Sequence, residues 1–286
     1  MHNPETGQPS DDAARFATAT RDETVTRDAT ATREKFGAYL GELIDTARRA
    51  PDIVGLVGMG STAERHRVDE WSDHDFALVT ADGAQDRYRA DLAWLPASSS
   101  IALSVVEHHG GVKVIYDDGH VLEFGIASID QLATWNANAY DVLYDAGGVA
   151  EAMALVAARP LPTGEPDDAR DIRLVMTQLL IGVGRARRGE ALSASTIIRA
   201  EAVAYLLTVL GRRLPGDSSR LDALDSRRRF EFVHPALAFR ISGALMLEPE
   251  RAARELLEIA EEHLEPGWED FPRRGVAALR ARLGWR

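Results

Sequence analysis

The chain has 286 residues, of which 45% are hydrophobic and 27% are charged. This length and this apolar content suit two folded domains and exclude wholesale disorder. Acidic residues outnumber lysine and arginine by 45 to 33, for a net charge of −12. Nucleic acid is therefore disfavoured as a partner, whereas small cationic molecules are favoured. The absence of cysteine excludes disulfides, thiolate metal sites and a cysteine nucleophile.

Two features of the sequence argue against a membrane segment. The first 20 residues lack the apolar core of a secretory signal. The most apolar stretch, residues 174–183, is too short to span a bilayer. We therefore expect a cytoplasmic protein without a membrane partner.

The first half of the chain predicts helices and strands after a polar start. Residues 1–34 are rich in Thr, Ala, Asp and Arg, without an apolar period, and predict a flexible polar tail. Helical spacing of apolar residues predicts helices at 35–49, 85–95 and 149–159. Short apolar runs bounded by turn residues predict strands at 53–59, 76–80, 101–107, 112–117, 121–127 and 142–145.

The second half of the chain predicts helices only. After Pro160 and Pro162, helical apolar periods cover residues 172–187, 195–213, 251–264 and 276–283. The chain is therefore expected to have the α+β class, in which a mixed β-sheet flanked by helices at 35–162 precedes a C-terminal α-helical bundle at 163–286.

Three short features near the first two predicted strands indicate a site for metal and phosphate. Gly60 and Ser61 follow the first strand, and their turn offers backbone N–H groups and a hydroxyl to phosphate oxygens. Asp73 and Asp75 are two residues apart at the start of the second strand, so both carboxylates lie on one face. Such a pair repels unless a cation lies between the two groups, and Mg²⁺ prefers oxygen ligands.

Glu123 lies within the apolar run of residues 121–125, where a charged side chain costs free energy unless it is paired or functional. Gly125, two residues later on the same face, leaves room beside it. The alternative is a carboxylate on a solvent-facing surface, paired with Lys113 or an arginine. His74, between the two aspartates, points to the opposite face and is expected to pack there.

This pattern of a Gly-Ser turn, a carboxylate pair about a dozen residues later and a carboxylate on a later strand resembles the polymerase-β-like nucleotidyltransferase superfamily. Within it, residues 122–125 (LEFG) are similar to the glutamate-bearing strand of the streptomycin/spectinomycin-type aminoglycoside nucleotidyltransferases, and the chain also resembles the lincosamide nucleotidyltransferases. Members often have a glycine four residues after the serine, where this chain has Arg65. Arg65 or Arg67 is then an alternative phosphate contact.

The resemblance implies a catalytic nucleotidyltransferase domain at 35–162 and an acceptor-binding helical domain at 163–286. It implies that Asp73 and Asp75 bind Mg²⁺ that bridges a nucleoside triphosphate, while Gly60 and Ser61 hold the β- and γ-phosphates. Glu123 would bind metal, act as the general base, or do both. The implied reaction transfers AMP from ATP to a hydroxyl of a small molecule such as an aminoglycoside or lincosamide antibiotic, and it releases pyrophosphate.

Two other functions remain open at the level of the sequence. One is an antitoxin-like nucleotidyltransferase that modifies a protein or tRNA. The other is a nucleotide-binding sensor without turnover, although such a protein would not require Glu123. The acceptor, the preferred nucleotide and the oligomeric state do not follow from the sequence.

Overall fold

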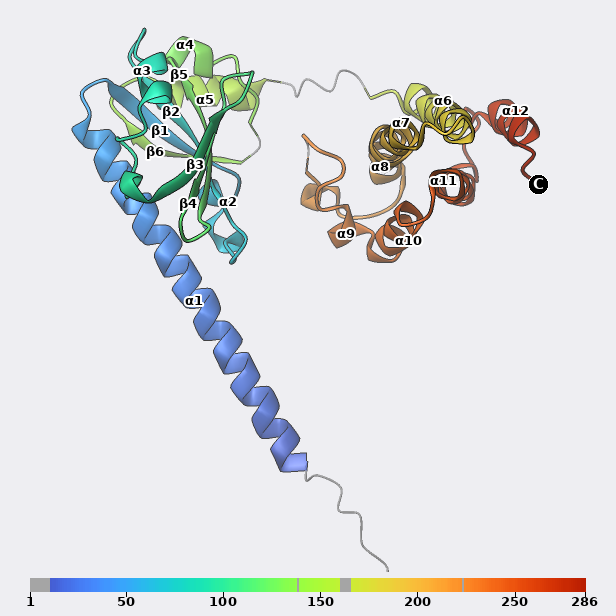
Figure 1. Ribbon diagram of the computed structural model, residues 1–286, viewed down its shortest axis with the longest axis horizontal. Helices are drawn as coiled ribbons and strands as arrows, with labels where there is room; N and C mark the ends of the chain where they lie inside the picture. The colour runs from blue at the N-terminus through green and yellow to red at the C-terminus, as the bar shows by residue number, and fades with distance from the viewer. Residues whose placement is uncertain (1–10, 138, 160–165, 223) are drawn as a thin grey trace, which may run out of the picture. The chain divides into compact units, whose positions relative to one another are not determined.

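The computed structural model describes residues 11–137, 139–159, 166–222 and 224–286. It divides into two compact units, Met1–Pro160 and Leu161–Arg286, which are considered separately below (Figure 1). The domain boundary that the sequence analysis places after residue 162 lies outside the described residues.

The first unit is built on a mixed six-stranded sheet. Its strand order is β3-β4-β5-β2-β1-β6, with β2 and β5 parallel and the other neighbouring pairs antiparallel. All six strands lie where the sequence predicts them, and the α+β class with a mixed sheet flanked by helices is confirmed. The strands are β1 (Ile53–Met59), β2 (His74–Thr80), β3 (Ile101–Val106), β4 (Val112–Tyr116), β5 (Val121–Ala127) and β6 (Tyr140–Asp145).

One long helix, α1 (Asp11–Arg49), covers one face of the sheet through its C-terminal part (Figure 1). Phe36, Leu40 and Leu43 are buried there. The sequence analysis expected a flexible tail as far as residue 34, whereas the structure has helix from Asp11; residues 1–10 lie outside the described residues. Residues 11–36 contain no proline or glycine, so nothing in this segment interrupts a helix. The segment also lacks an apolar face, and the helix therefore cannot be recognised from the spacing of apolar residues.

Two helices cover part of the opposite face of the sheet. α4 (Ile129–Leu132) begins with a capping box between Ser128 and Gln131, and α5 (Val149–Ala158) follows β6. Asp145 accepts hydrogen bonds from the N–H groups of Gly147, Val149 and Ala150 at the start of α5. These helices pack on Ala77, Val79 and Ala127, while Leu103 on β3 and Ile115 on β4 remain exposed.

Short helices occupy the loops of the first unit. α2 (Gly60–Ala63) follows β1 directly, and α3 (Gln85–Ala90) follows β2. The two 3₁₀ helices here are Arg65–Arg67 and Ser98–Ser100. The predicted helix 85–95 is therefore shorter than expected.

The second unit is a bundle of helices around one apolar core. Its α-helices are α6 (Asp168–Arg187), α7 (Ala191–Thr196), α8 (Val203–Arg213), α9 (Phe230–Val233), α10 (Pro235–Leu245), α11 (Pro249–Leu264) and α12 (Arg273–Leu283). A π-helical segment, Ile197–Ala202, joins α7 to α8, and Ser218–Arg220 forms a 3₁₀ turn. The buried face of α11 consists of Ala252, Ala253, Leu256, Leu257, Ile259, Ala260 and Leu264, as its helical apolar period predicts.

One helical segment of the described chain, Ala191–Arg213, is long and apolar enough to cross a membrane by length and composition alone. Several of its side chains, including Ile198, Leu206 and Leu210, are fully buried in the core of the helical unit. Core helices of soluble proteins pass the same test, so this segment is weak evidence for a membrane.

We expect Leu256→Ala to lower the free energy of unfolding of the helical unit by about 3 kcal/mol, because Leu256 is 0% exposed and its truncation leaves a cavity in the core. Chemical denaturation followed by circular dichroism measures the change. Leu192→Ala is the matched control, since Leu192 is 89% exposed and its loss should change stability by less than about 0.5 kcal/mol. Equal losses in both variants would contradict the assignment of the core.

Candidate active site

The two aspartates lie where β2 begins. Asp73 directly precedes the strand, and Asp75 is its second residue. In the antiparallel pair of β1 with β2, Asp75 is the register partner of Met59, the last residue of β1. The end of β1, the turn that follows it and the start of β2 therefore meet at one place.

Glu123 joins the aspartates through the one parallel pairing in the described sheet. In the register of β2 with β5, Asp75 is directly opposite Glu123. One carboxylate oxygen from each of Asp73, Asp75 and Glu123 lies within 4.8 Å of the others, and no other cluster of this kind occurs in the described parts of the chain. The structure thus brings together the three carboxylates that the sequence analysis selected, although Asp75 and Glu123 are 48 residues apart in the chain.

The cluster suits a hard divalent cation. All three donors are carboxylate oxygens, the ligand type that Mg²⁺ and Mn²⁺ prefer. Asp73 and Asp75 are half-buried and Glu123 is exposed, so the site is open to solvent on one side. Mutual repulsion of three nearby anions is relieved when a cation binds between them.

Gly60 allows the turn after β1 to approach Asp75 closely. Its φ is +52°, in the left-handed region, and a Cβ built on it would lie 2.6 Å from Asp75 Oδ2. Any side chain at this position would therefore strain the backbone and displace the carboxylate. The sequence analysis selected Gly60 for its backbone N–H; the structure adds this second requirement.

Two hydroxyls fasten the turn to the start of β2. Ser61 Oγ donates a hydrogen bond to the carbonyl oxygen of Asp73 at 3.1 Å, and Thr62 Oγ1 accepts one from the backbone N–H of Asp75 at 3.0 Å. Thr62 is fully buried, and sequence reasoning missed it. The available signal was a threonine directly after the Gly-Ser pair, at a position without an apolar period.

Glu123 also forms an ion pair with a lysine on the neighbouring strand. Lys113 on β4 is its register partner, and Lys113 Nζ lies 3.0 Å from Glu123 Oε2. The hydrogen bond to Glu123 raises the pKa of Lys113. The Glu123 side chain is 47% exposed, so the cost of burying a charge in an apolar strand, which the sequence analysis invoked, does not apply. Its pairing with Lys113 is the alternative that the sequence left open.

The space beside Glu123 is closed by an aromatic ring. A Cβ built on Gly125 would lie 2.2 Å from Cη2 of Trp135. Gly125 therefore leaves room, as expected, but Trp135 occupies it. The indole ring therefore covers the main chain of β5 at Gly125, two residues from Glu123.

The two arginines near the turn have carboxylate partners in the structure. Arg65 Nη2 lies 3.5 Å from Asp141 Oδ2, and Arg67 forms an ion pair with Glu64. Neither guanidinium is therefore free to bind phosphate. The sequence analysis gave phosphate binding by Arg65 or Arg67 as an alternative, because Arg65 stands where members of the superfamily that the chain resembles often have glycine. Contact with phosphate would require either guanidinium to leave its present partner.

His74 points to the opposite face of the sheet and packs there, as its alternation with the aspartates predicts. It is 1% exposed and stacks on Phe36 with ring centroids 3.6 Å apart. Its Nε2 donates to the carbonyl oxygen of Phe36 at 3.1 Å, and its Nδ1 lies 2.7 Å from Nε2 of His120. Burial lowers the pKa of His74 to about 3, so the neutral ring accepts a hydrogen bond from His120.

Comparison with known proteins yields little. No protein-family model matches the chain, and no curated protein matches it in sequence. Among solved structures, the chain is similar to an aminoglycoside 6-adenyltransferase from Bacillus subtilis, with 11% identity over 87% of this chain and 91% of that chain, and a TM-score of 0.26. A likeness at this level does not identify a family, so the function has to be argued from the site itself.

We expect Gly60→Ala to weaken binding of Mn²⁺ by about tenfold or more, because the added methyl displaces the Asp75 carboxylate. Electron paramagnetic resonance of free Mn²⁺ measures the affinity. The matched control is Gly119→Ala, since Gly119 has φ +83° and open space around its Cβ position. Both variants should lose about 1–2 kcal/mol of stability from the left-handed backbone, and equal Mn²⁺ affinities would contradict the role of Gly60.

We expect acid to destabilise the protein partly through His74. Its pKa is about 3 in the folded protein against the ordinary 6.5, so between these values the unfolded chain binds a proton that the folded protein does not. The free energy of unfolding therefore falls as the pH falls from 6.5 toward 3. In His74→Gln the slope of this free energy against pH should be shallower in that range, as denaturation at several pH values would show. An unchanged slope would rule out this contribution.

Proposed function

We propose that this protein is a Mg²⁺-dependent nucleotidyltransferase that transfers AMP from ATP to a hydroxyl group of a small molecule and releases pyrophosphate. The observation that carries the proposal is the cluster of Asp73, Asp75 and Glu123, whose oxygens lie within 4.8 Å of one another beside the Gly60-Ser61 turn. A cluster of carboxylates next to a turn with a hydroxyl and backbone N–H groups suits a metal-bound triphosphate.

Each residue has a distinct part in the proposed reaction. Asp73 and Asp75 would hold Mg²⁺, which would supply charge stabilisation to the phosphate oxygens. Gly60 and Ser61 contact the β- and γ-phosphates. Glu123 completes the metal site, or accepts the proton of the attacking hydroxyl, or does both. Glu123 is exposed and forms an ion pair with Lys113, so an acceptor hydroxyl can reach its carboxylate from solvent.

The bond changes are those of an in-line displacement at phosphorus. The acceptor oxygen forms a bond to the α-phosphorus, while the bond from that phosphorus to the oxygen that bridges it to the β-phosphorus breaks. The acceptor proton goes to Glu123 or to solvent, and pyrophosphate leaves with the electron pair of the broken bond. Positioning and charge stabilisation provide the rate enhancement, because the chain forms no covalent intermediate in this scheme.

The acceptor we propose is an aminoglycoside or lincosamide antibiotic, bound through the helical unit, in a cytoplasmic reaction. The net charge of −12 favours a cationic small molecule over tRNA, which would meet electrostatic repulsion. Modification of a protein or tRNA, and nucleotide sensing without turnover, are then the outcomes to be excluded by experiment.

We expect pyrophosphate release from ATP with Mg²⁺ to depend on an aminoglycoside or lincosamide, and Asp75→Asn to reduce that rate by roughly a thousandfold. The loss reflects about 4 kcal/mol of transition-state stabilisation when a metal-binding carboxylate becomes an amide. A coupled pyrophosphate assay with each nucleoside triphosphate and a panel of antibiotics makes the measurement.

Leu192→Ala on the helical surface is the matched control and should retain the full rate, since its side chain is exposed. Acceptor-independent nucleotide binding without pyrophosphate release would favour the sensor. Release that depends on a cell extract rather than on any antibiotic would favour a macromolecular acceptor. A full rate in Asp75→Asn would overturn the assignment of the site.

A further inference from the structure

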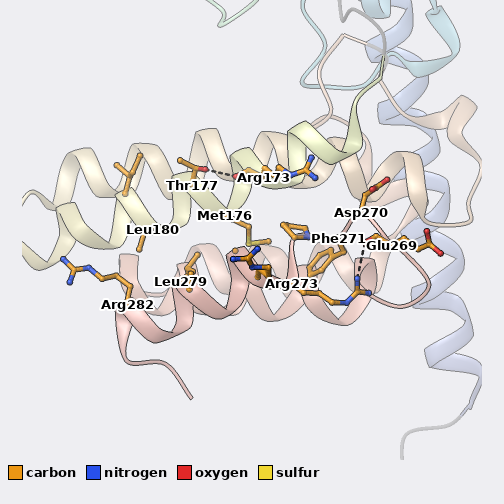
Figure 2. A pocket seen from close by; sticks show the side chains of 15 residues that line it. Arg173, Met176, Thr177, Leu180, Glu269, Asp270, Phe271, Arg273, Leu279 and Arg282 are labelled. Atoms are coloured by element: carbon orange, nitrogen blue, oxygen red, sulfur yellow. Dashed lines mark hydrogen bonds between the residues drawn. The ribbon is translucent and has the colours of Figure 1, made fainter.

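The helical unit contains a groove of about 1060 Å³ between α6 and α12 and the loop that precedes α12. Figure 2 shows Met176 of α6 and Leu279 of α12 pointing into the space between these helices. The size is at the upper end of the range for small-molecule sites. The proposed transferase reaction does not use any residue named for this groove.

The floor of the groove is apolar. Met176, Phe271 and Leu279 are buried beneath it, and Leu180 and Ile181 line it further along α6. Ile181 is 44% exposed, so apolar surface remains in contact with water along this wall. Covering it removes apolar surface from water, which favours binding of an apolar group.

Exposed arginines stand at both ends of this floor. Arg173 donates a hydrogen bond to the carbonyl oxygen of Ala169, and no carboxylate among the described residues pairs with it. For Arg274 and Arg282, the described chain provides neither a hydrogen bond nor an ion pair to the side chain. By contrast, the guanidinium of Arg273 forms an ion pair with Glu265, which occupies it and leaves it less able to bind an anionic ligand.

The charge balance of the groove is opposite to that of the chain. Four arginines line it against two carboxylates, Glu269 and Asp270, although the protein as a whole carries −12. Figure 2 shows both carboxylates at the end where α12 begins and Arg282 at the other end. A cationic ligand would therefore be repelled along most of the groove, and an anionic one attracted.

We propose that this groove binds an amphipathic organic anion, with its apolar body on Leu180 and Ile181 and its acidic group paired with Arg274 or Arg282. These two arginines are eight residues apart on α12, which is about 12 Å along a helix. An elongated molecule of that length covers the floor and reaches a guanidinium. Guanidinium groups bind carboxylate and phosphate in the same two-pronged manner, so both kinds of acidic group belong to this ligand class.

The test is isothermal titration calorimetry of the full chain with decanoate and with decyl phosphate. We expect saturable binding of at least one of them, and the comparison identifies the preferred acidic group. Decyltrimethylammonium, which has the same tail and the opposite charge, should bind at least tenfold more weakly. Acetate, which has the acidic group without the tail, should not bind measurably, since each buried methylene contributes to affinity.

The double variant Arg274→Gln/Arg282→Gln should weaken binding of the better probe by about tenfold or more, because a charge-assisted hydrogen bond is lost. Arg251→Gln removes an exposed arginine on α11 outside the groove and should leave binding unchanged. The proposal is overturned if neither probe saturates, if decyltrimethylammonium binds equally well, or if the double variant binds like the native protein. All of these results are independent of whether the protein transfers nucleotides.

Discussion

The parallel pairing of β2 with β5 is the constraint on which the carboxylate cluster depends. It places Asp75 and Glu123 side by side, although their charges repel. The same register stacks Phe76 on Phe124 on the other face, with ring centroids 4.7 Å apart. Each buried side chain there contributes about 2 kcal/mol, whereas two charges within 4.8 Å of each other repel by about 1–4 kcal/mol near a surface. Packing on one face therefore maintains the proximity of charges on the other.

The sequence predicts the local features of this arrangement and not the pairing itself. Apolar runs bounded by turn residues reveal every strand, and the spacing of Asp73 and Asp75 reveals that they share a face. The proximity of Glu123 to Asp75 depends on a contact between distant segments, which no local sequence pattern encodes. The sequence analysis reached this proximity only through a family resemblance. The ion pair with Lys113 was foreseen only as an alternative, because exposure of a strand face depends on which helices cover it.

Helices without a clear apolar period were the hardest to predict. The N-terminal part of α1 lacks an apolar face in its sequence, and sequence periodicity locates helices through the surface they bury. α10 was missed for a different reason: it buries Leu237, Ala238, Ile241 and Ala244 on one face, but this apolar period spans only two turns after a proline. By contrast, α11 buries a continuous face and was located closely, from 251–264 against Pro249–Leu264.

Two close approaches make the site depend on pairs of positions rather than on single residues. Gly60 accommodates the Asp75 carboxylate, and Gly125 accommodates the ring of Trp135. In each pair a larger residue at the glycine position crowds its partner. Among homologous sequences, these positions should therefore vary together, and a protein that has lost the carboxylate at position 75 loses the steric requirement for glycine at position 60, although the left-handed φ of the turn still favours glycine there. The four positions together would distinguish distant relatives that retain the site from those that retain only the fold.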